Sequence, residues 1–250
     1  SHVDNSILDP SEFIQSNIVG TFNLLEAFRS NWESMPKMRK LNSRFIHIST
    51  DEVFGSIEDN NKFNELSRYD PRSPYSASKA SSDLLVKAWH NTYGIPIIIS
   101  NCSNNYGPFQ FPEKLIPKTI INCINQKTIP LYGNGENIRD WLYVEDHIDA
   151  LLLLAKKGNV GESYCVGGYG ETKNIEIVDH ICSLMDAIAP LNKKYNSLIR
   201  FVKDRPGHDK RYSIDSKKIF KELGWEPKFN LINGLKKTIN WYLNNNKWYE

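Results

Sequence analysis

Hydrophobic and polar positions follow two distinct patterns in the first half of the chain. Phe45–Thr50 and Ile95–Ser100 are short, mostly apolar runs, which are typical of strands buried within a parallel sheet. Apolar residues recur at helical spacing from Ser11 to Phe28 and from Pro74 to Tyr93, which predicts two helices. The order helix, strand, helix, strand therefore predicts an α/β fold, a parallel sheet with helices on its faces.

The second half of the chain predicts a looser succession of elements. The first residues, Ser1 to Asp4, have the pattern of a strand end that runs into a loop. The basic stretch 31–44 predicts no element, and residues 56–72 have the composition of a loop. Further helices are predicted at Leu115–Ile124, Asp146–Lys157, Asn174–Ile188, Asp215–Leu223 and Leu231–Leu243, and strands at Thr128–Tyr132, Glu162–Val166 and Leu198–Val202.

Bulk composition restricts the classes of function. A net charge of +2 gives no reason to expect nucleic acid or a membrane surface as a partner. The longest apolar run, Ala150–Ala155, is far too short to span a bilayer. The four cysteines lie far apart without a C-x-x-C pair, so we expect neither a disulfide framework nor a metal site. This cysteine pattern fits a reducing compartment, and the first residues show no signal-peptide pattern, so we expect a cytoplasmic protein.

Tyr75 and Lys79 are the first candidate for chemistry. Their i, i+4 spacing places both side chains on one face of the predicted helix. A phenol beside an ammonium group becomes a better base, because the cation favours the phenolate. The same spacing recurs at Tyr169 and Lys173 inside a glycine-rich turn, which we interpret as a chance match.

Asp51 and Glu52 follow the first strand directly, after Ser49 and Thr50. Ligands of parallel sheets bind beyond the carboxyl ends of strands. There the Thr50 hydroxyl can bond a substrate oxygen, and two carboxyl groups in different surroundings can divide into acid and base. The residues alone leave an alternative equally open, namely that Asp51 and Glu52 only cap a turn.

Three loop segments carry further polar groups, each with an ordinary structural alternative. The amide-rich run 101–108 could bind sugar hydroxyls, a carboxamide or phosphate, although a turn explains it better. Arg139 and Arg205 could clamp a diphosphate if the fold brings them together, and His208 could contact a substrate hydroxyl. Solvated arginines and a hydrogen-bonded structural histidine are the alternatives. Neither phosphate-binding glycine motif, G-x-G-x-x-G after a strand or G-x-x-x-x-G-K-[ST], is present.

Several motifs together resemble a known family. They span nearly all of residues 1–225 and read SHVD, NIVGT, STDEVFG, PYSASKASSDLL, NCSNNYGP, FPEKLIP, LYGNGENIRDWLYVEDH, YCVGG and DRPGHDKRY. On these motifs the chain resembles the extended short-chain dehydrogenases/reductases, and among them the nucleotide-sugar 4,6-dehydratases, above all the dTDP-glucose 4,6-dehydratases. The Tyr-Lys pair is shared by the superfamily, whereas Thr-Asp-Glu after the strand is specific to the 4,6-dehydratases.

The resemblance implies a lyase that uses and regenerates NAD. It implies that Tyr75, assisted by Lys79, removes the proton of the sugar 4-hydroxyl while NAD accepts the C4 hydride, and that Thr50 bonds the 4-oxygen. Glu52 then removes the C5 proton, Asp51 protonates the departing 6-hydroxyl, and the hydride returns to C6. The implied product is a 4-keto-6-deoxy sugar nucleotide, a precursor of deoxysugars such as rhamnose.

The resemblance also assigns binding residues and a partner. The residues expected at the nicotinamide half of NAD are Ser49, Tyr75, Lys79, Asn101 and Ser103. Those expected at a dTDP-sugar or UDP-sugar are Asn105, Lys114, Leu115, Tyr132, Arg139, Asn174, Arg205 and His208. It further implies a homodimer that packs two helices of each subunit, about Ser11–Phe28 and Tyr75–Tyr93, into a four-helix interface.

A two-part chain is implied, without the family's dinucleotide fingerprint. Residues 1–108, with returning segments from about 135–170, would form the C-terminal part of a Rossmann-like NAD-binding domain with helices on both faces of its sheet. Residues 109–250 would form mostly a smaller α/β sugar-nucleotide-binding domain. Because the fingerprint lies upstream of SHVD in the family, we expect residues 1–250 alone to bind NAD poorly, as an unstable or inactive fragment.

Three alternatives stay open at this point. UDP-glucose is an alternative substrate, since a thymine methyl group contributes little to discrimination. A 4-epimerase or a decarboxylase of the same fold is an alternative activity, and Asp51-Glu52 argue against the epimerase. A non-catalytic, NAD-free scaffold or dimerisation partner is the third alternative.

Overall fold

The computed structural model describes residues 3–58, 61–204 and 207–249 of the chain. At its centre lies a three-stranded parallel sheet in the order β1-β2-β7, made of Phe45–Thr50, Ile97–Cys102 and Ser163–Val166. The register pairs Thr50 with Cys102 and Cys102 with Val166, so the carboxyl ends of the three strands meet at one edge. The predicted α/β fold with a Rossmann-like parallel sheet is confirmed.

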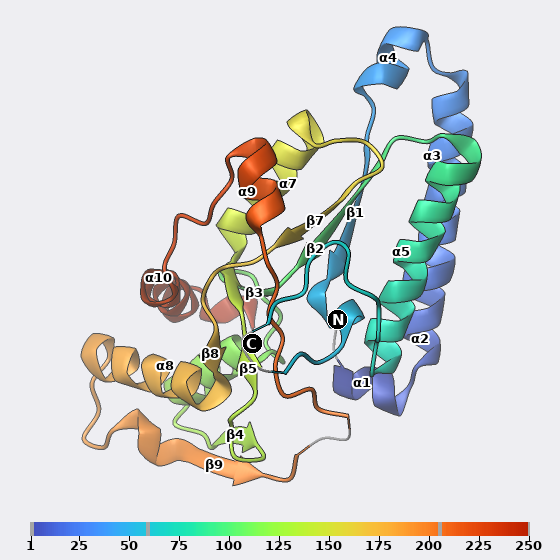
Figure 1. The fold of residues 1–250 in the computed structure, drawn as a ribbon. Coiled ribbons are helices and arrows are strands. Elements are labelled where there is room, and N and C mark those ends of the chain that lie inside the picture. The colour runs from blue at the N-terminus through green and yellow to red at the C-terminus, as the bar shows by residue number, and fades with distance from the viewer. Residues whose placement is uncertain (1–2, 59–60, 205–206, 250) are drawn as a thin grey trace.

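Helices cover both faces of this sheet (Figure 1): α3 (Gly20–Ser34) and α5 (Pro74–Tyr93) on one side, α7 (Val144–Lys157) and α9 (Lys217–Leu223) on the other. The strand side chains alternate between the two layers. Ile97 and Ile99 of β2 pack with α3 and α5, whereas Ile98 packs with α7 and α9. Burial on both faces explains why the strand sequences are almost continuously apolar.

A second apolar core lies beside this sheet. It is enclosed by α6 (Leu115–Ile124), α8 (Asn174–Ile188) and α10 (Leu231–Asn244), next to the parallel pair β4 (Ile129–Tyr132) and β9 (Ile199–Val202). Two short strand pairs complete this part, β3 (Asn104–Tyr106) with β6 (Trp141–Tyr143) and β5 (Ile138–Arg139) with β8 (Thr172–Lys173). The division of the chain near residue 108 stays a prediction.

The N-terminal region differs most from the sequence-based expectations. Val3–Leu8 form helix α1 where a strand end was expected, and the first two residues lie outside the described part. The basic stretch 31–44 continues α3 to Ser34 and then forms α4 (Lys37–Asn42), because Lys, Met, Arg and Leu favour helix without an apolar period. The helix predicted from Ser11 consists of α2 (Ser11–Phe13), a π-helical segment η1 (Ile14–Val19) and α3.

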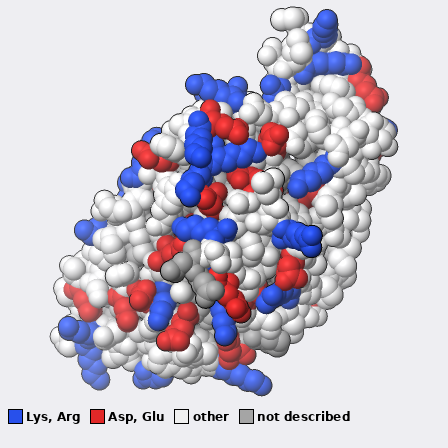
Figure 2. Space-filling view, viewed as in Figure 1, with Lys and Arg blue, Asp and Glu red and all other residues white. Residues whose placement is uncertain are grey.

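The surface has no dominant charge of one sign on the face shown in Figure 2, where Lys and Arg are interspersed with Asp and Glu. None of the helices in the described ranges is long and apolar enough to cross a membrane. The remaining short helices are the 3-10 segments η2 (Asp51–Phe54), η3 (Tyr195–Leu198) and η4 (Asn246–Trp248).

Gly234 lets α10 approach strand β3 closely. A Cβ atom at Gly234 would lie 2.1 Å from the hydroxyl oxygen of Tyr106, the last residue of β3. That hydroxyl donates to the Leu231 carbonyl at 3.3 Å, so helix and strand also share a hydrogen bond.

Gly234→Ala should therefore destabilise the protein, although alanine is the better helix former. We expect a loss of roughly 1–3 kcal/mol in the free energy of unfolding, because the methyl group overpacks against Tyr106. Gly20→Ala is the matched control, since its Cβ would meet only the Gln15 carbonyl at 3.7 Å. Helix propensity alone predicts a gain of about 0.5–1 kcal/mol there. Urea unfolding measures both variants, and equal effects would contradict the packing argument.

Candidate active site

Strand β1 ends in the three residues expected to carry the chemistry. Thr50 caps η2, because its hydroxyl oxygen accepts a hydrogen bond from the Glu52 N–H at 3.3 Å. The same hydroxyl donates to the Asp51 carboxyl group at 3.2 Å. The turn is thus capped by the threonine, and the carboxyl groups of Asp51 and Glu52 line a cavity together with it.

The carboxyl group of Asp51 is buried, and its Oδ2 atom has no hydrogen-bond partner within the described residues. Burial raises the pKa of this group well above its ordinary value, and the nearby carboxyls of Glu52 and Asp140 act in the same direction. Arg139 and the hydrogen bond from Thr50 oppose the shift. The surroundings therefore favour the protonated acid over the carboxylate.

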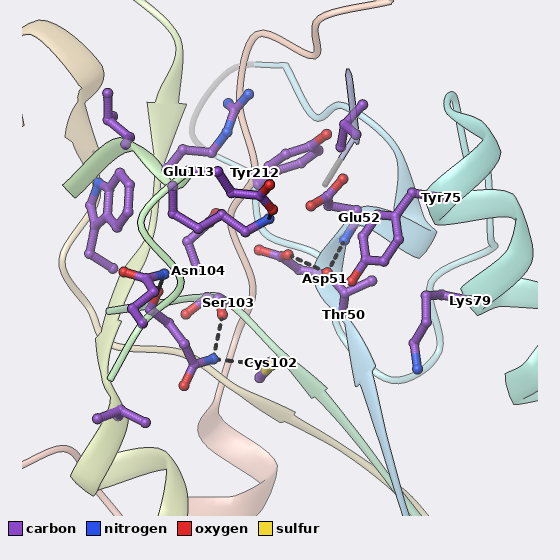
Figure 3. A pocket seen from close by; sticks show the side chains of 18 of the residues that line it. Thr50, Asp51, Glu52, Tyr75, Lys79, Cys102, Ser103, Asn104, Glu113 and Tyr212 are labelled. Carbon is purple, nitrogen blue, oxygen red and sulfur yellow. Dashed lines mark hydrogen bonds and ion pairs between the residues drawn. The ribbon is translucent and has the colours of Figure 1, made fainter. Parts of the chain in front are cut away.

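Helix α5 presents Tyr75 in its first turn. Ser73 forms a capping box at the helix start, and Pro74 occupies the first helical position, where its missing N–H costs nothing. Figure 3 shows the Tyr75 hydroxyl pointing toward Thr50, with Glu52 nearby. The end of β1 and the start of α5 therefore meet at one point of the cavity.

Burial also raises the pKa of the Tyr75 phenol well above its ordinary value. The neighbouring acidic groups Glu52, Cys102 and Asp51 add to this shift, and a hydrogen bond with Thr50 opposes it. In the chain alone, Tyr75 is therefore a protonated hydrogen-bonding group.

Lys79 lines the same cavity one turn after Tyr75 and contacts the backbone of β1. Its ammonium group donates to the Ile48 carbonyl at 2.7 Å. Burial lowers the pKa of Lys79 itself, while Asp83 and Cys102 oppose that shift. The expectation that Lys79 lowers the pKa of Tyr75 stays a prediction, and burial of the phenol is the largest influence on that pKa in this structure.

The cavity has a volume of about 780 Å³, within the usual range for small-molecule sites. Of the predicted site residues, those that line it are Ser49, Thr50, Asp51, Glu52, Tyr75, Lys79, Ser103, Asn105, Lys114, Leu115, Tyr132, Arg139, Asn174 and His208. Arg205 lies outside the described residues.

Asn101 does not line the cavity, and its predicted contact with the cofactor stays a prediction. Its amide nitrogen donates to the Thr50 carbonyl at 3.4 Å and to Asp83 Oδ2 at 3.3 Å. The side chains of β2 alternate between the two faces, and Asn101 points toward α5 rather than into the cavity. Its observed hydrogen bonds connect the end of β1 to α5 on the side of the strand that faces away from the cavity.

Arg139 is a buried cation held in place by the protein. Its guanidinium group donates to the carbonyls of Ile138 at 2.7 Å and Asp209 at 2.9 Å, and lies 4.2 Å from the centre of the Tyr212 ring. Such a fixed planar fork suits bidentate recognition of phosphate or carboxylate. Its predicted role as a phosphate ligand is therefore compatible with its place in the cavity.

The second predicted cluster joins His208 and Tyr132. His208 Nδ1 lies 2.6 Å from Asp204 Oδ1, and its ring stands edge-on to the Tyr132 ring at 6.3 Å between centroids. The Tyr132 hydroxyl donates to Asp4 Oδ2 at 3.0 Å, so helix α1 reaches the same side of the cavity.

The cavity also holds residues that the sequence analysis did not single out. Glu113 and Tyr212 also line the cavity and are labelled in Figure 3. Both lie inside quoted motifs, FPEKLIP and DRPGHDKRY, which were the available signal. Cys102, expected to be a small buried hydrophobe, is indeed buried, and burial raises the pKa of its thiol to about 12. It is therefore not a reactive thiolate.

Several buried polar atoms of the cavity lining have no hydrogen-bond partner in the described part of the chain. Besides Asp51 Oδ2, they are Ser103 Oγ, Asn104 Oδ1, Gln110 Oε1, Trp141 Nε1, His147 Nε2 and Asn174 Oδ1. Buried polar atoms are normally paired, so this set fits a ligand rich in hydroxyl and amide groups, as NAD and sugar nucleotides are. Within residues 3–58, 61–204 and 207–249, no three His, Cys, Asp or Glu side chains are grouped to hold a metal ion.

A Rossmann-like sheet with Thr-Asp-Glu and Tyr-Lys at one cavity defines a short-chain dehydrogenase/reductase acting on a nucleotide-linked sugar. The model of the GDP-mannose 4,6 dehydratase family matches residues 1–238, and the chain belongs to this family. Within it, the chain is 54% identical to a dTDP-glucose 4,6-dehydratase of Escherichia coli, over 100% of this chain and 72% of that protein. The resemblance to the dTDP-glucose 4,6-dehydratases is confirmed.

Solved structures extend the comparison. DesIV, a dTDP-glucose 4,6-dehydratase from Streptomyces venezuelae solved with NAD and TYD bound, is 42% identical with a TM-score of 0.90, over 100% of this chain and 72% of that one. A UDP-glucose 4-epimerase of Thermotoga maritima, solved with UDP-glucose, is 26% identical with a TM-score of 0.84, over 98% of this chain and 74% of that one. Both activities thus occur on this fold.

His147 should make the stability of the protein sensitive to acid. Burial lowers its pKa to about 4, against about 6.5 in an unfolded chain. The contribution of neutral, buried His147 to the free energy of unfolding is fully present above pH ~6.5. It is lost as the pH falls toward about 4, because the unfolded chain then binds a proton that the folded chain does not. From this residue we expect a free energy of unfolding about 2 kcal/mol lower at pH 5 than at pH 7.

Urea unfolding at pH 5 and pH 7 compares the wild type with His147→Gln. The amide of glutamine does not titrate and can still donate to Asn105 Oδ1, which His147 Nδ1 contacts at 2.9 Å. The variant should lose less stability between the two pH values. Equal losses in both proteins would show that His147 does not titrate as described.

Proposed function

We propose that the protein is a lyase that converts dTDP-glucose to dTDP-4-keto-6-deoxyglucose with NAD as a regenerated cofactor. The observation that carries this proposal is the buried carboxyl group of Asp51 next to Glu52, on the same cavity as Thr50 and Tyr75; its burial raises its pKa well above the ordinary value. The names of the Escherichia coli and Streptomyces venezuelae relatives support the substrate, and the bound NAD of the latter supports the cofactor.

The first half of the reaction requires a base at the sugar 4-hydroxyl. NAD, when bound, supplies the acceptor for the C4 hydride and the source of the same hydride for C6. Tyr75 accepts the 4-hydroxyl proton, and Thr50 bonds the 4-oxygen. Since burial raises the pKa of Tyr75, the hydrogen bond with Thr50 and the positive charge of Lys79 are needed for it to act as a base.

The second half eliminates water across C5 and C6. The 4-ketone acidifies the C5 proton, which Glu52 removes and returns to C5 when the hydride is delivered to C6. Asp51 donates its proton to the 6-oxygen as the C6–O bond breaks, so that water leaves. The division of labour follows from the difference in burial, since Asp51 is buried and Glu52 is only partly so.

The remaining cavity residues bind the ligands. Arg139 binds the diphosphate, together with Arg205, and Tyr132 packs near the nucleobase. Lys79, Ser49 and Ser103 contact the nicotinamide half of the cofactor. The other sugar-nucleotide ligands that we propose are Asn105, Lys114, Leu115, Asn174 and His208, all of which line the cavity.

We also propose a cytoplasmic homodimer. Its interface is formed by the helices between Ser11 and Phe28 and by α5, which lie side by side along one edge of the molecule (Figure 1). Phe22 and Leu24 of α3 and Leu84 of α5 are large apolar side chains exposed on this pair. Burial of such a surface against a second copy removes apolar area from water.

A product assay of the full-length protein with dTDP-glucose tests the reaction. The 4-keto product should give an alkali-induced absorbance, with no net consumption of NAD. Formation of dTDP-galactose without this chromophore would favour the 4-epimerase. Absence of any turnover would favour the non-catalytic scaffold. Equal specificity constants for dTDP-glucose and UDP-glucose would remove the preference for thymidine.

Asp51→Asn should separate the two halves of the reaction. Asparagine cannot donate a proton to the 6-oxygen, so NADH should accumulate transiently and the elimination should slow by roughly 100-fold or more. Tyr75→Phe is the paired variant, which should form no NADH yet bind the sugar nucleotide. Stopped-flow absorbance measures both, and equal, mild effects would mean that the two residues only stabilise turns.

A further inference from the structure

Helix α5 carries a third polar residue on the face of Tyr75 and Lys79. Asp83 follows Lys79 by four residues, so the three side chains share one side of the helix. Asp83 is 0% exposed and does not line the cavity. The reaction proposed above gives it no task.

Donors from three segments converge on the Asp83 carboxylate. Its Oδ1 atom lies 3.0 Å from His47 Nε2 of β1. Its Oδ2 atom accepts from the hydroxyls of Ser49 at 2.7 Å and Tyr69 at 2.8 Å. The Asn101 amide of β2 also donates to Oδ2, at 3.3 Å. A buried carboxylate is costly to desolvate and persists only when so fully bonded, which fixes its donors in turn.

These donors lie next to the proposed catalytic groups. Ser49 directly precedes Thr50, and the Asn101 amide also donates to the Thr50 carbonyl at 3.4 Å. One turn earlier on α5, Lys79 donates to the Ile48 carbonyl at 2.7 Å. Helix α5 therefore bonds to residues 47–49 of β1 at two successive turns, and Asn101 of β2 connects Asp83 to Thr50.

We propose that Asp83 is a positioning residue that fixes the end of β1 against α5, and so fixes Thr50, Asp51 and Glu52 relative to Tyr75. Apolar side chains of α5, β1 and β2 share one core, which holds the two elements together without the polar network, so the network can set their exact relative position rather than their folding. A misplacement of about 1 Å at reacting groups can cost roughly 100-fold in rate. This proposal rests on the proposed function, because the rate of the dehydratase reaction is the measurement that reports how Thr50, Asp51 and Glu52 are placed relative to Tyr75.

Asp83 also acts on Lys79 through its charge. Burial lowers the pKa of Lys79, and the nearby acidic groups Asp83 and Cys102 raise it again. Removing the charge of Asp83 therefore lowers the pKa of Lys79 further. A rate that needs protonated Lys79 then declines at a lower pH on the alkaline side.

The test is Asp83→Asn in the full-length protein, after the wild type has shown dehydratase turnover. We expect kcat to fall by roughly 10–100-fold and the Kd for dTDP, measured by calorimetry, to stay within about twofold. The alkaline limb of the kcat–pH profile should move to lower pH.

Asp146→Asn is the matched control. Asp146 is also a buried carboxylate, and it accepts from the backbone N–H groups of Lys228 and Phe229 at 3.0 Å each, away from the cavity lining. The Asp146→Asn variant should lower the melting temperature about as much as Asp83→Asn does. Its kcat should stay within about twofold of the wild type, and its kcat–pH profile should not move.

Wild-type kcat and an unmoved profile in Asp83→Asn would overturn the proposal, as would equal effects of the two variants. If Asp83→Asn does not fold, Asn101→Ala decides, because it removes the donor that joins Asp83 to the Thr50 carbonyl. A several-fold lower kcat at unchanged dTDP affinity supports the positioning role, and unchanged kcat overturns it. Absence of dehydratase turnover in the wild-type protein would instead refute the proposed function.

Discussion

Removal of the Asp51 carboxyl group from water is the constraint on which the candidate site depends. In water, two adjacent carboxyl groups would both ionise near neutral pH and could not serve as acid and base. Burial of Asp51, with the charges of Glu52 and Asp140 nearby, favours its protonated form. Thr50 caps the turn with its own hydroxyl, so that cap requires neither carboxyl group. Both acidic residues line the cavity.

The parallel sheet explains how distant segments reach this pair. Strand β1 delivers Asp51 and Glu52 at the carboxyl edge, and the capped start of α5 delivers Tyr75 to the same point. The second core supplies the rest of the cavity, with Arg139 held rigid by backbone carbonyls and the ring of Tyr212. The buried Asp83 network joins β1, β2 and α5 behind the cavity. Rigid elements thus place the groups more precisely than loops could.

Long regular patterns made much of this predictable from the sequence. Phe45–Thr50, Pro74–Tyr93, Leu115–Ile124 and Asn174–Ile188 match their predicted ranges, because local period and capping determine them. The contacts of Lys79 with Ile48 and of Asn101 with Asp83 were not predictable, since they join residues distant in the chain. The short strands β3, β5, β6 and β8 have too few residues for a period. Motif resemblance, rather than periodicity, supplied the sugar-nucleotide residues of the second core.

The most direct test of the account is the protonation state of Asp51 itself. Isotope-edited infrared spectroscopy of the aspartate carboxyl groups, as the difference between wild type and Asp51→Asn, follows that state across pH. The account predicts a protonated-acid carbonyl band assigned to Asp51 that persists well above the pH at which an exposed aspartate ionises. A carboxylate signature for Asp51 already at pH 5 would contradict it, since the acid of the proposed elimination would then be missing.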